Sequence, residues 1–162
     1  MNTSSRVFDS HVHIYPDAMA PRIVAQLGAA TREPPSYDGT RAGLLEKMAA
    51  AGIAGALNAP VATRPDQVKS VNTWAASQNR WPMLSLGSIH PDFPEIATEL
   101  RRIRTLGLHG VKLHPEYQAF SPDEPRLEPV WRTCRELGLT VLLHALHNLL
   151  PLLFLLAMRN WL

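Results

Sequence analysis

The chain has 162 residues and a formal net charge of +2, because 16 Lys and Arg residues stand against 14 Asp and Glu residues. This length suits one domain, and a hydrophobic fraction of 46% argues against a disordered chain. Since the positive surplus is small and no concentrated basic run is present, we expect no nucleic-acid partner. The single cysteine, Cys134, excludes an internal disulfide and a zinc site built on several thiolates, and it fits a cytoplasmic protein.

Apolar runs of strand length alternate with stretches of helical periodicity along the chain. Residues 7–13 are β-rich and predict the first strand. A long segment rich in proline and polar residues follows at 14–39, with a short helix expected around 21–27. Thr40 then predicts the N-cap of a helix that Gly52 ends.

The rest of the chain repeats this alternation. One helix is expected to begin at Pro65, and two more are expected at residues 94–106 and 127–137. The remaining strands are expected at residues 53–59, 83–89, 110–114 and 140–144. Strand starts roughly 30 residues apart are typical of βαβ units, which form a parallel sheet with helices outside it. The pattern therefore predicts an α/β fold, either a doubly wound sheet or part of a (β/α)8 barrel, which needs about 250 residues when complete.

Three polar side chains alternate along the first strand, namely Asp9, His11 and His13. A strand points alternate side chains to one face, so we expect all three on the same face. Two imidazoles at this spacing can bind one metal ion, with Asp9 as a supporting outer partner. The alternative is a coincidental His-x-His pattern on an exposed strand.

Another histidine, His144, ends the last expected strand. In a parallel α/β fold the C-terminal ends of all strands lie on one rim, where functional sites form. We therefore expect His11, His13 and His144 to converge at that rim.

Three further side chains are expected to bind substrate at the same rim. Lys112 and His114 share one face of the strand at 110–114, and His90 follows the strand at 83–89. Alternatively, His90-Pro91 and His114-Pro115 are turns that end their strands.

Four segments together resemble one enzyme family. Phe-Asp-Ser-His-Val-His at 8–13 resembles the strand-one signature of the amidohydrolase superfamily. Three more segments resemble the amidohydrolase-related branch of this superfamily, which consists of metal-dependent hydrolases. They are Gly-Ser-Ile-His-Pro-Asp-Phe-Pro at 87–94, Gly-Val-Lys-Leu-His-Pro-Glu-Tyr-Gln at 110–118 and Val-Leu-Leu-His-Ala at 141–145. The resemblance implies a partial (β/α)8 TIM barrel, with about five parallel strands, outer helices and a divalent metal ion at the C-terminal rim.

The same resemblance implies roles for the rim residues. His11 and His13 match the first two metal ligands, and His144 matches the ligand from strand five. The ion is expected to be Zn, with Mn or Fe as alternatives. Lys112 matches a position that holds a carboxylated lysine bridging two ions in some members; otherwise it is a substrate-binding or framework cation.

The implied activity is that of a metal-dependent hydrolase, in which metal-activated water attacks an amide, ester or lactone-type carbon of a small molecule. Non-oxidative decarboxylation of small acids, which related members carry out with the same kind of centre, is the alternative. The family's catalytic aspartate from strand eight has no match in this sequence. The catalytic base is therefore unassigned, and an inactive fragment is a third interpretation.

The end of the sequence departs from the family pattern. After Ala145 the composition shifts to leucine, where the family commonly has a Gly-x-Asp-like segment. We therefore divide the chain into a barrel part at 1–145 and an apolar tail, expected to be helical, at 146–162, and we expect a truncated or frame-shifted product or a fragment. The tail is expected to cover the edge of the last strand, or to join copies into a homo-oligomer at the open barrel edge. Pro151 and nearby polar residues interrupt it, so we expect no stable membrane insertion.

Weaker patterns concern a loop, a thiol and one helix face. The segment 14–39 is expected to lie over the rim as a substrate lid, with Tyr15, Arg32 and Tyr37 as contacts. Cys134 falls at core spacing and is expected to be a buried thiol rather than a nucleophile. A solvated helix face is expected for three arginines, Arg101, Arg102 and Arg104.

Overall fold

The computed structural model describes residues 7–31 and 34–144, and the order of its elements confirms the expected β/α alternation. The strands are β1 (Val7–Val12), β2 (Ile53–Asn58), β3 (Met83–Ser85), β4 (Gly87–Ser88), β5 (Gly110–Leu113) and β6 (Thr140–Leu143). The helices are α1 (Ala20–Thr31), α2 (Arg41–Ala51), α3 (Val68–Gln78), α4 (Ile96–Thr105) and α5 (Glu128–Leu137), with 3-10 turns η1 (Pro65–Gln67) and η2 (Pro125–Leu127). Within the described part of the chain, no helix combines the length and apolar character needed to cross a membrane. Arg32 and the expected tail at 146–162 lie outside the described residues.

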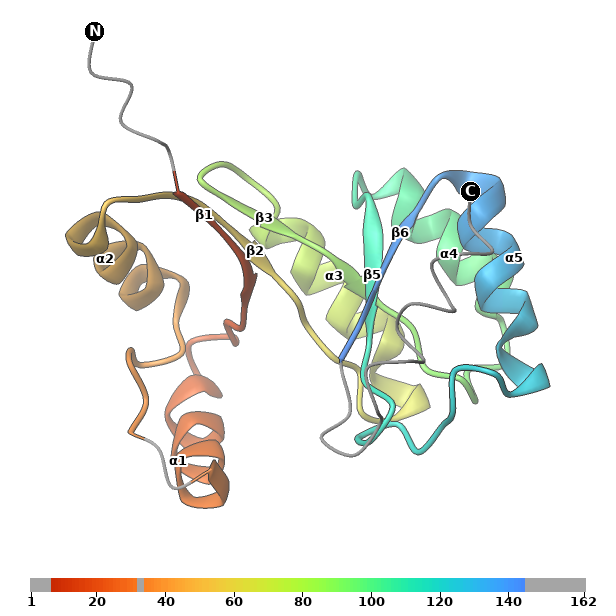
Figure 1. Cartoon of the computed structure of the whole chain (residues 1–162), viewed down its shortest axis with the longest axis horizontal. Coiled ribbons are helices and arrows are strands. Elements are labelled where there is room, and N and C mark those ends of the chain that lie inside the picture. Colours follow the sequence, from red (N-terminus) through yellow and green to blue (C-terminus); the bar gives the residue numbers. More distant parts are fainter. Residues whose placement is uncertain (1–6, 32–33, 145–162) are drawn as a thin grey trace, which may run out of the picture.

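Paired strands are parallel, and neighbouring strands follow one another in chain order (Figure 1). The order is β1-β2-β3 in one sheet and β4-β5-β6 in the next, and only Leu86 separates β3 from β4. A doubly wound sheet reverses its strand order at a switch point, whereas a (β/α)8 barrel adds each strand beside the previous one. The order here is that of a barrel, and the described strands form an open part of one.

The strand expected at 83–89 is divided in two. Leu86 still donates its backbone N–H to the backbone O of Asn58 in β2 (2.9 Å), but Gly87 already pairs with Val111 of β5. The chain therefore changes its hydrogen-bonding neighbour from β2 to β5 within two residues. The prediction of one continuous strand was wrong for this reason.

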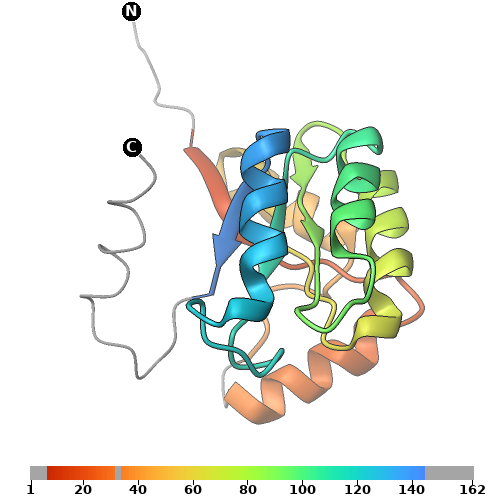
Figure 2. The same cartoon turned by 90° about the vertical axis from the view of Figure 1, so that its right-hand side faces the viewer.

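The helices α2, α3, α4 and α5 lie on one side of the strands, and the apolar core fills the space between these helices and the strands. Helix α1, the orange helix in Figure 2, runs across the ends of the strands. The larger core cluster joins α3, α4 and α5 to β5, and its fully buried members include Leu100, Ile103, Val111, Leu113 and Val130. A smaller cluster joins α2 to the first sheet through Leu44, Met48, Val12, Ala56 and Met83. The opposite side of the strands faces the interior of the barrel part and carries the candidate site.

Local signals set the ends of two helices as expected. The Thr40 side chain accepts a hydrogen bond from the backbone N–H of Gly43 (3.0 Å), and Gly52 and Gly138 end α2 and α5 with φ values of +68° and +62°. The helix expected around residues 21–27 is longer in the structure, where α1 runs from Ala20 to Thr31. Cys134 is fully buried as expected, and burial raises the pKa of its thiol to about 12.

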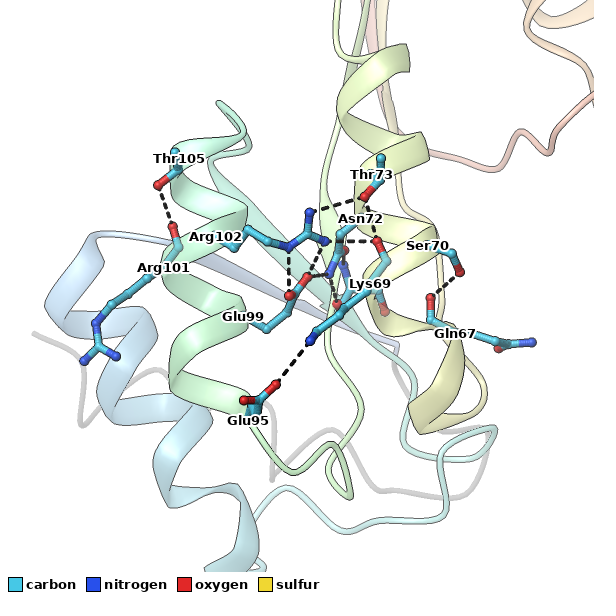
Figure 3. Close-up of polar contacts among 11 residues, drawn as sticks. Gln67, Lys69, Ser70, Asn72, Thr73, Glu95, Glu99, Arg101, Arg102 and Thr105 are labelled. Atoms are coloured by element: carbon cyan, nitrogen blue, oxygen red, sulfur yellow. Dashed lines mark hydrogen bonds and ion pairs between the residues drawn. The ribbon is translucent and has the colours of Figure 1, made fainter.

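A buried polar network joins α3, α4 and β4 (Figure 3). The Glu99 carboxylate, 2% exposed, accepts hydrogen bonds from the Asn72 amide (2.8 Å) and from Nε and Nη2 of Arg102 (2.9 and 2.7 Å). Asn72 Nδ2 also donates to the backbone O of Ser88 in β4 (3.0 Å). The expected solvated face describes Arg101 and Arg104, which are exposed, and holds only in part for Arg102, whose side chain is 34% exposed and whose guanidinium pairs with the buried Glu99 carboxylate.

Candidate metal centre

β1 and the residue after it carry two of the three predicted ligands, and this strand is irregular. Its register runs from Asp9 beside Ala56 to Val12 beside Asn58, so three steps along β1 match two along β2. An extra residue of this kind bends a strand and interrupts the alternation of its side chains. Asp9 Oδ1 accepts a hydrogen bond from the backbone N–H of His11 (3.1 Å). The regular alternation expected for Asp9, His11 and His13 is therefore interrupted between Asp9 and Val12, and Asp9 supports the backbone of His11.

The imidazoles that the sequence predicts as ligands lie together at the C-terminal ends of β1 and β6. The ring centroids of His11 and His13 are 4.9 Å apart, and those of His11 and His144 are 6.1 Å apart. A fourth ring, His114 after β5, stacks on His144 with centroids 4.0 Å apart. The fold thus brings side chains from three strands to one place on the rim, while their role as ligands stays a prediction.

Lys112 is fully buried on β5 although its side chain ends in an amine. Its Nζ lies 3.5 Å from Nε2 of His11. Its backbone O accepts a hydrogen bond from the hydroxyl of Ser88 (3.0 Å), which fixes β5 against β4. Burial lowers the pKa of Lys112 to about 8, so protonated and neutral amine are both populated at mildly alkaline pH.

The pKa values of three histidines in this group, His11, His13 and His114, are lowered, which favours their neutral form. Burial lowers the pKa of His13 to about 4, and charge on His11 and Lys112 acts in the same direction. The pKa of His114 also falls to about 4, through burial and then through His144 and Lys112. Burial, Lys112 and His144 together lower the pKa of His11. Neutral imidazole is the form that donates a nitrogen lone pair to a metal ion.

The spacing of these rings differs from that of ligands around one ion. Within residues 7–31 and 34–144, no three His, Cys, Asp or Glu side chains are arranged to hold a metal ion together. His144 lies against His114 instead, with the two ring planes 11° apart. In donor type the group nevertheless suits a divalent cation, because several neutral imidazoles meet at the ends of the strands. The residues therefore fit such an ion chemically, and His144 is the ring whose stacking competes with that role.

Gln118 supports the backbone at the rim, and the sequence patterns did not single it out. Its buried side chain accepts a hydrogen bond from the backbone N–H of His114 and donates to the backbone O of Ala62 and of Ile89, each at 2.8 Å. One amide thus joins the segments that follow β2, β4 and β5. The next residue, Ala119, has a φ of +50°, which is uncommon for a residue with a Cβ. The only sequence signal for Gln118 was its place in the segment 110–118.

His114 and His90, both predicted to bind substrate, have different surroundings. His114 lies between the rings of His144 and Tyr117, and the Tyr117 ring is nearly parallel to it with centroids 3.9 Å apart. Tyr117 is 56% exposed, so this stack presents an aromatic surface to solvent. Nδ1 of the buried His90 accepts a hydrogen bond from the backbone N–H of Asp92 (3.1 Å). His90 is therefore part of a turn that ends its strand, as the alternative interpretation of the sequence had it. Its contact with substrate stays a prediction.

The segment 14–39 is anchored to the end of β1. The Tyr37 hydroxyl donates to the backbone O of His13, and the backbone N–H of Tyr15 donates to the backbone O of Gly39 (2.9 Å). Tyr15 also borders a cavity of about 370 Å³, together with Arg41 and Trp74, and burial raises the pKa of Tyr15 to about 12. The segment thus lies against one of the predicted ligands, while its action as a lid stays a prediction.

Comparisons with known proteins agree with the described fold. A family model described as Amidohydrolase matches residues 8–157. The comparison with curated proteins gives no match.

Several solved structures share the fold. A 5-carboxyvanillate decarboxylase from Novosphingobium aromaticivorans, complexed with manganese and 4-hydroxy-3-methoxy-5-nitrobenzoic acid, has a TM-score of 0.68 and 18% identity over 87% of this chain and 50% of that chain. IDCase from Metarhizium anisopliae has a TM-score of 0.67 and 18% identity, and the match covers 88% of this chain and 51% of that chain. A probable 2-pyrone-4,6-dicarboxylic acid hydrolase from Acinetobacter baumannii, with citric acid bound, has a TM-score of 0.58 and 18% identity. This match covers 96% of this chain and 54% of that chain. The chain therefore spans about half the length of these proteins.

Proposed function

This chain belongs to the amidohydrolase family, and we propose that it binds a divalent metal ion at the strand rim and acts there on a small-molecule substrate. The observation that carries the proposal is the meeting of His11, His13 and His144 beside the buried Lys112. These side chains come from distant parts of the chain, and packing the core does not require them to meet.

His11, His13 and His144 would hold the ion through neutral imidazole nitrogens. Such an ion supplies Lewis acidity, which polarises a carbonyl oxygen and lowers the pKa of water. We propose Zn first, with Mn and Fe as alternatives. The manganese in the similar decarboxylase structure supports a divalent ion but does not favour Zn.

The residues around the histidines would orient the substrate. Lys112, when protonated, places positive charge beside His11 and would attract an acidic group of the substrate. The stacked rings of His114 and Tyr117 offer a flat surface for an unsaturated or aromatic part. His90, near the same rim, is a third proposed contact.

Two reactions are proposed for this centre. Hydrolysis of an amide, ester or lactone-type bond is the first, and similarity to a probable pyrone hydrolase supports it. Non-oxidative decarboxylation of a small acid is the second, and similarity to a decarboxylase supports it equally. Hydrolysis also needs a group that accepts the proton of water. No group among the described residues is assigned this role, so metal binding without turnover is a third proposal.

Metal content and turnover test these proposals separately. After dialysis against metal-free buffer, we expect elemental analysis to find about one ion per chain in the parent protein. His11→Ala with His13→Ala should abolish this, whereas His109→Ala, an exposed histidine elsewhere, should retain it. Metal content that is equal in the parent and the double variant would refute the site. Panels of esters, lactones and amides, and of small unsaturated acids monitored for carbon dioxide, then distinguish hydrolysis, decarboxylation and binding without turnover.

A further inference from the structure

The side of the strands opposite the helices carries a second zone besides the candidate metal centre. Ala56 of β2 and Met83 of β3 pack into the core under α2. Successive residues of a strand point to opposite faces, so Gly55 and Leu84 point away from that core, toward the barrel interior. By the same rule, the inner face of β5 carries Lys112, because Val111 and Leu113 pack into the other core cluster.

Near the start of β1 and β3 this inner face is apolar and exposed. Phe8 is 43% exposed, Trp81 64% and Leu84 41%. The Phe8 and Trp81 rings meet over Gly55, where an added Cβ would lie 2.9 Å from one ring and 2.8 Å from the other. We call Phe8, Trp81 and Leu84 the inner apolar patch. Phe8 and Trp81 lie against the same glycine, and Leu84 lies on the same face of the sheet. Exposed apolar side chains gathered on one face can mark a surface that something else covers.

We propose that residues 145–162 of the same chain cover the inner apolar patch. This segment follows His144 directly and contains eight leucines but only one charged side chain, Arg159. Eighteen residues span about 27 Å even as a helix, whereas a strand of six residues spans about 20 Å. The segment is therefore long enough to return from the C-terminal ends of the strands to the patch.

The size of the patch favours a tethered segment over a second copy of the chain. If a complete aromatic side chain offers 150–250 Å², the exposed parts of the three side chains amount to about 300 Å². A stable interface between separate molecules buries about 800 Å² on each partner. A segment joined to the same chain needs less area, because its effective concentration is in the millimolar range.

Thiol reactivity in the full chain tests this proposal. Leu84→Cys places a thiol in the patch, and Thr98→Cys places a control thiol on the exposed surface of α4. We expect iodoacetamide to modify the Leu84→Cys thiol about tenfold more slowly than the Thr98→Cys thiol, because the covering segment must open first. Adding Leu152→Asp and Leu156→Asp should raise the first rate about tenfold and leave the second unchanged.

Three results would overturn the proposal. The first is equal reactivity of the two thiols with the natural segment in place, and the second is protection of Leu84→Cys that survives both aspartates. The third is protection that increases with protein concentration together with a dimer in sedimentation, since a second copy would then cover the patch. The buried Cys134 reports folding throughout. If it becomes reactive in the double aspartate variant, the same criteria apply to the milder Leu156→Ser.

Discussion

The Asn72 side chain is the centre of the contact between α3, α4 and β4, and its replacement tests how firmly this contact holds the helices to the strands. Asn72→Ala removes three hydrogen bonds: Nδ2 donates to Ser88 O (3.0 Å) and Glu99 Oε1 (2.8 Å), and Oδ1 accepts from Ser88 N–H (2.7 Å). All three residues are at most 2% exposed, so water does not replace the lost partners. A buried polar group left without a bond costs about 1–3 kcal/mol, and we expect Asn72→Ala to lower the free energy of unfolding by about 3–5 kcal/mol.

Urea denaturation followed by circular dichroism measures this loss. For a chain of this size 1 kcal/mol changes Tm by about 2–4 °C, so Tm should fall by roughly 10 °C. Asn72→Asp should be at least as damaging, because it turns a carboxylate rather than an amide donor toward Glu99. Ser70→Ala, at an exposed position of the same helix, is the matched control and should change stability by less than about 0.5 kcal/mol. An Asn72→Ala variant within about 1 kcal/mol of the parent would refute the reasoning.

Three further predictions follow from buried groups elsewhere. In the metal-free protein, the free energy of unfolding should fall as pH decreases through the window from 6.5 to 4, because the pKa of His13 is about 4 in the fold and 6.5 in the unfolded chain, which therefore binds more protons there. Between pH 7 and pH 5 the free energy of unfolding, measured by urea titration, should fall by about 1–2 kcal/mol, and this loss should be smaller in His13→Asn. The same dependence of the free energy of unfolding on pH in both proteins would contradict this prediction. Gln118→Ala should lower the free energy of unfolding by about 2–4 kcal/mol, since it leaves three backbone groups without partners. Gln118→Glu should also be less stable than the parent, because it places a carboxylate against two carbonyl oxygens. Denaturation of either variant like that of the parent would count against this prediction. Cys134, whose pKa is raised to about 12 by burial, should react with a disulfide reagent at pH 8 only when the chain is unfolded by urea, and prompt reaction of the native protein would show that its thiol is accessible.

The sequence predicted the parts of the fold that depend on neighbours along the chain. Gly52 and Gly138 stop their helices because a left-handed residue ends a helix without a Cβ penalty, which is a local property. The break at Leu86 could not be predicted in this way, because it depends on which strand offers the next hydrogen-bond acceptor. Glu99 and Gln118 look like ordinary surface residues in the sequence, since their buried partners lie up to 56 residues away.

The candidate site shows the same division. Strand ends could be located from apolar runs and from the turns that follow them, so His11, His13 and His144 could be placed on one rim before their distances were known. The stacking of His144 on His114 could not, because it depends on side-chain torsions at the ends of two adjacent strands. The pairing of Arg102 with Glu99 was missed for a related reason, because the pattern of one helix does not reveal that Glu99 is buried against α3.

The two zones of the inner face impose different physical requirements, and this separates binding from folding. In the proposed function, the histidines and Lys112 at the C-terminal ends bind a small molecule, and burial favours the neutral form of His11, His13 and His114. The inner apolar patch lies at the other end, and its three side chains are exposed. Removing this apolar area from water lowers the free energy, so the patch favours a state in which it is covered. A variant of the patch should therefore act on stability and association while leaving metal content unchanged. A variant of the histidines should do the reverse, and a single substitution that moved both together would mean that the zones are coupled through the strands between them.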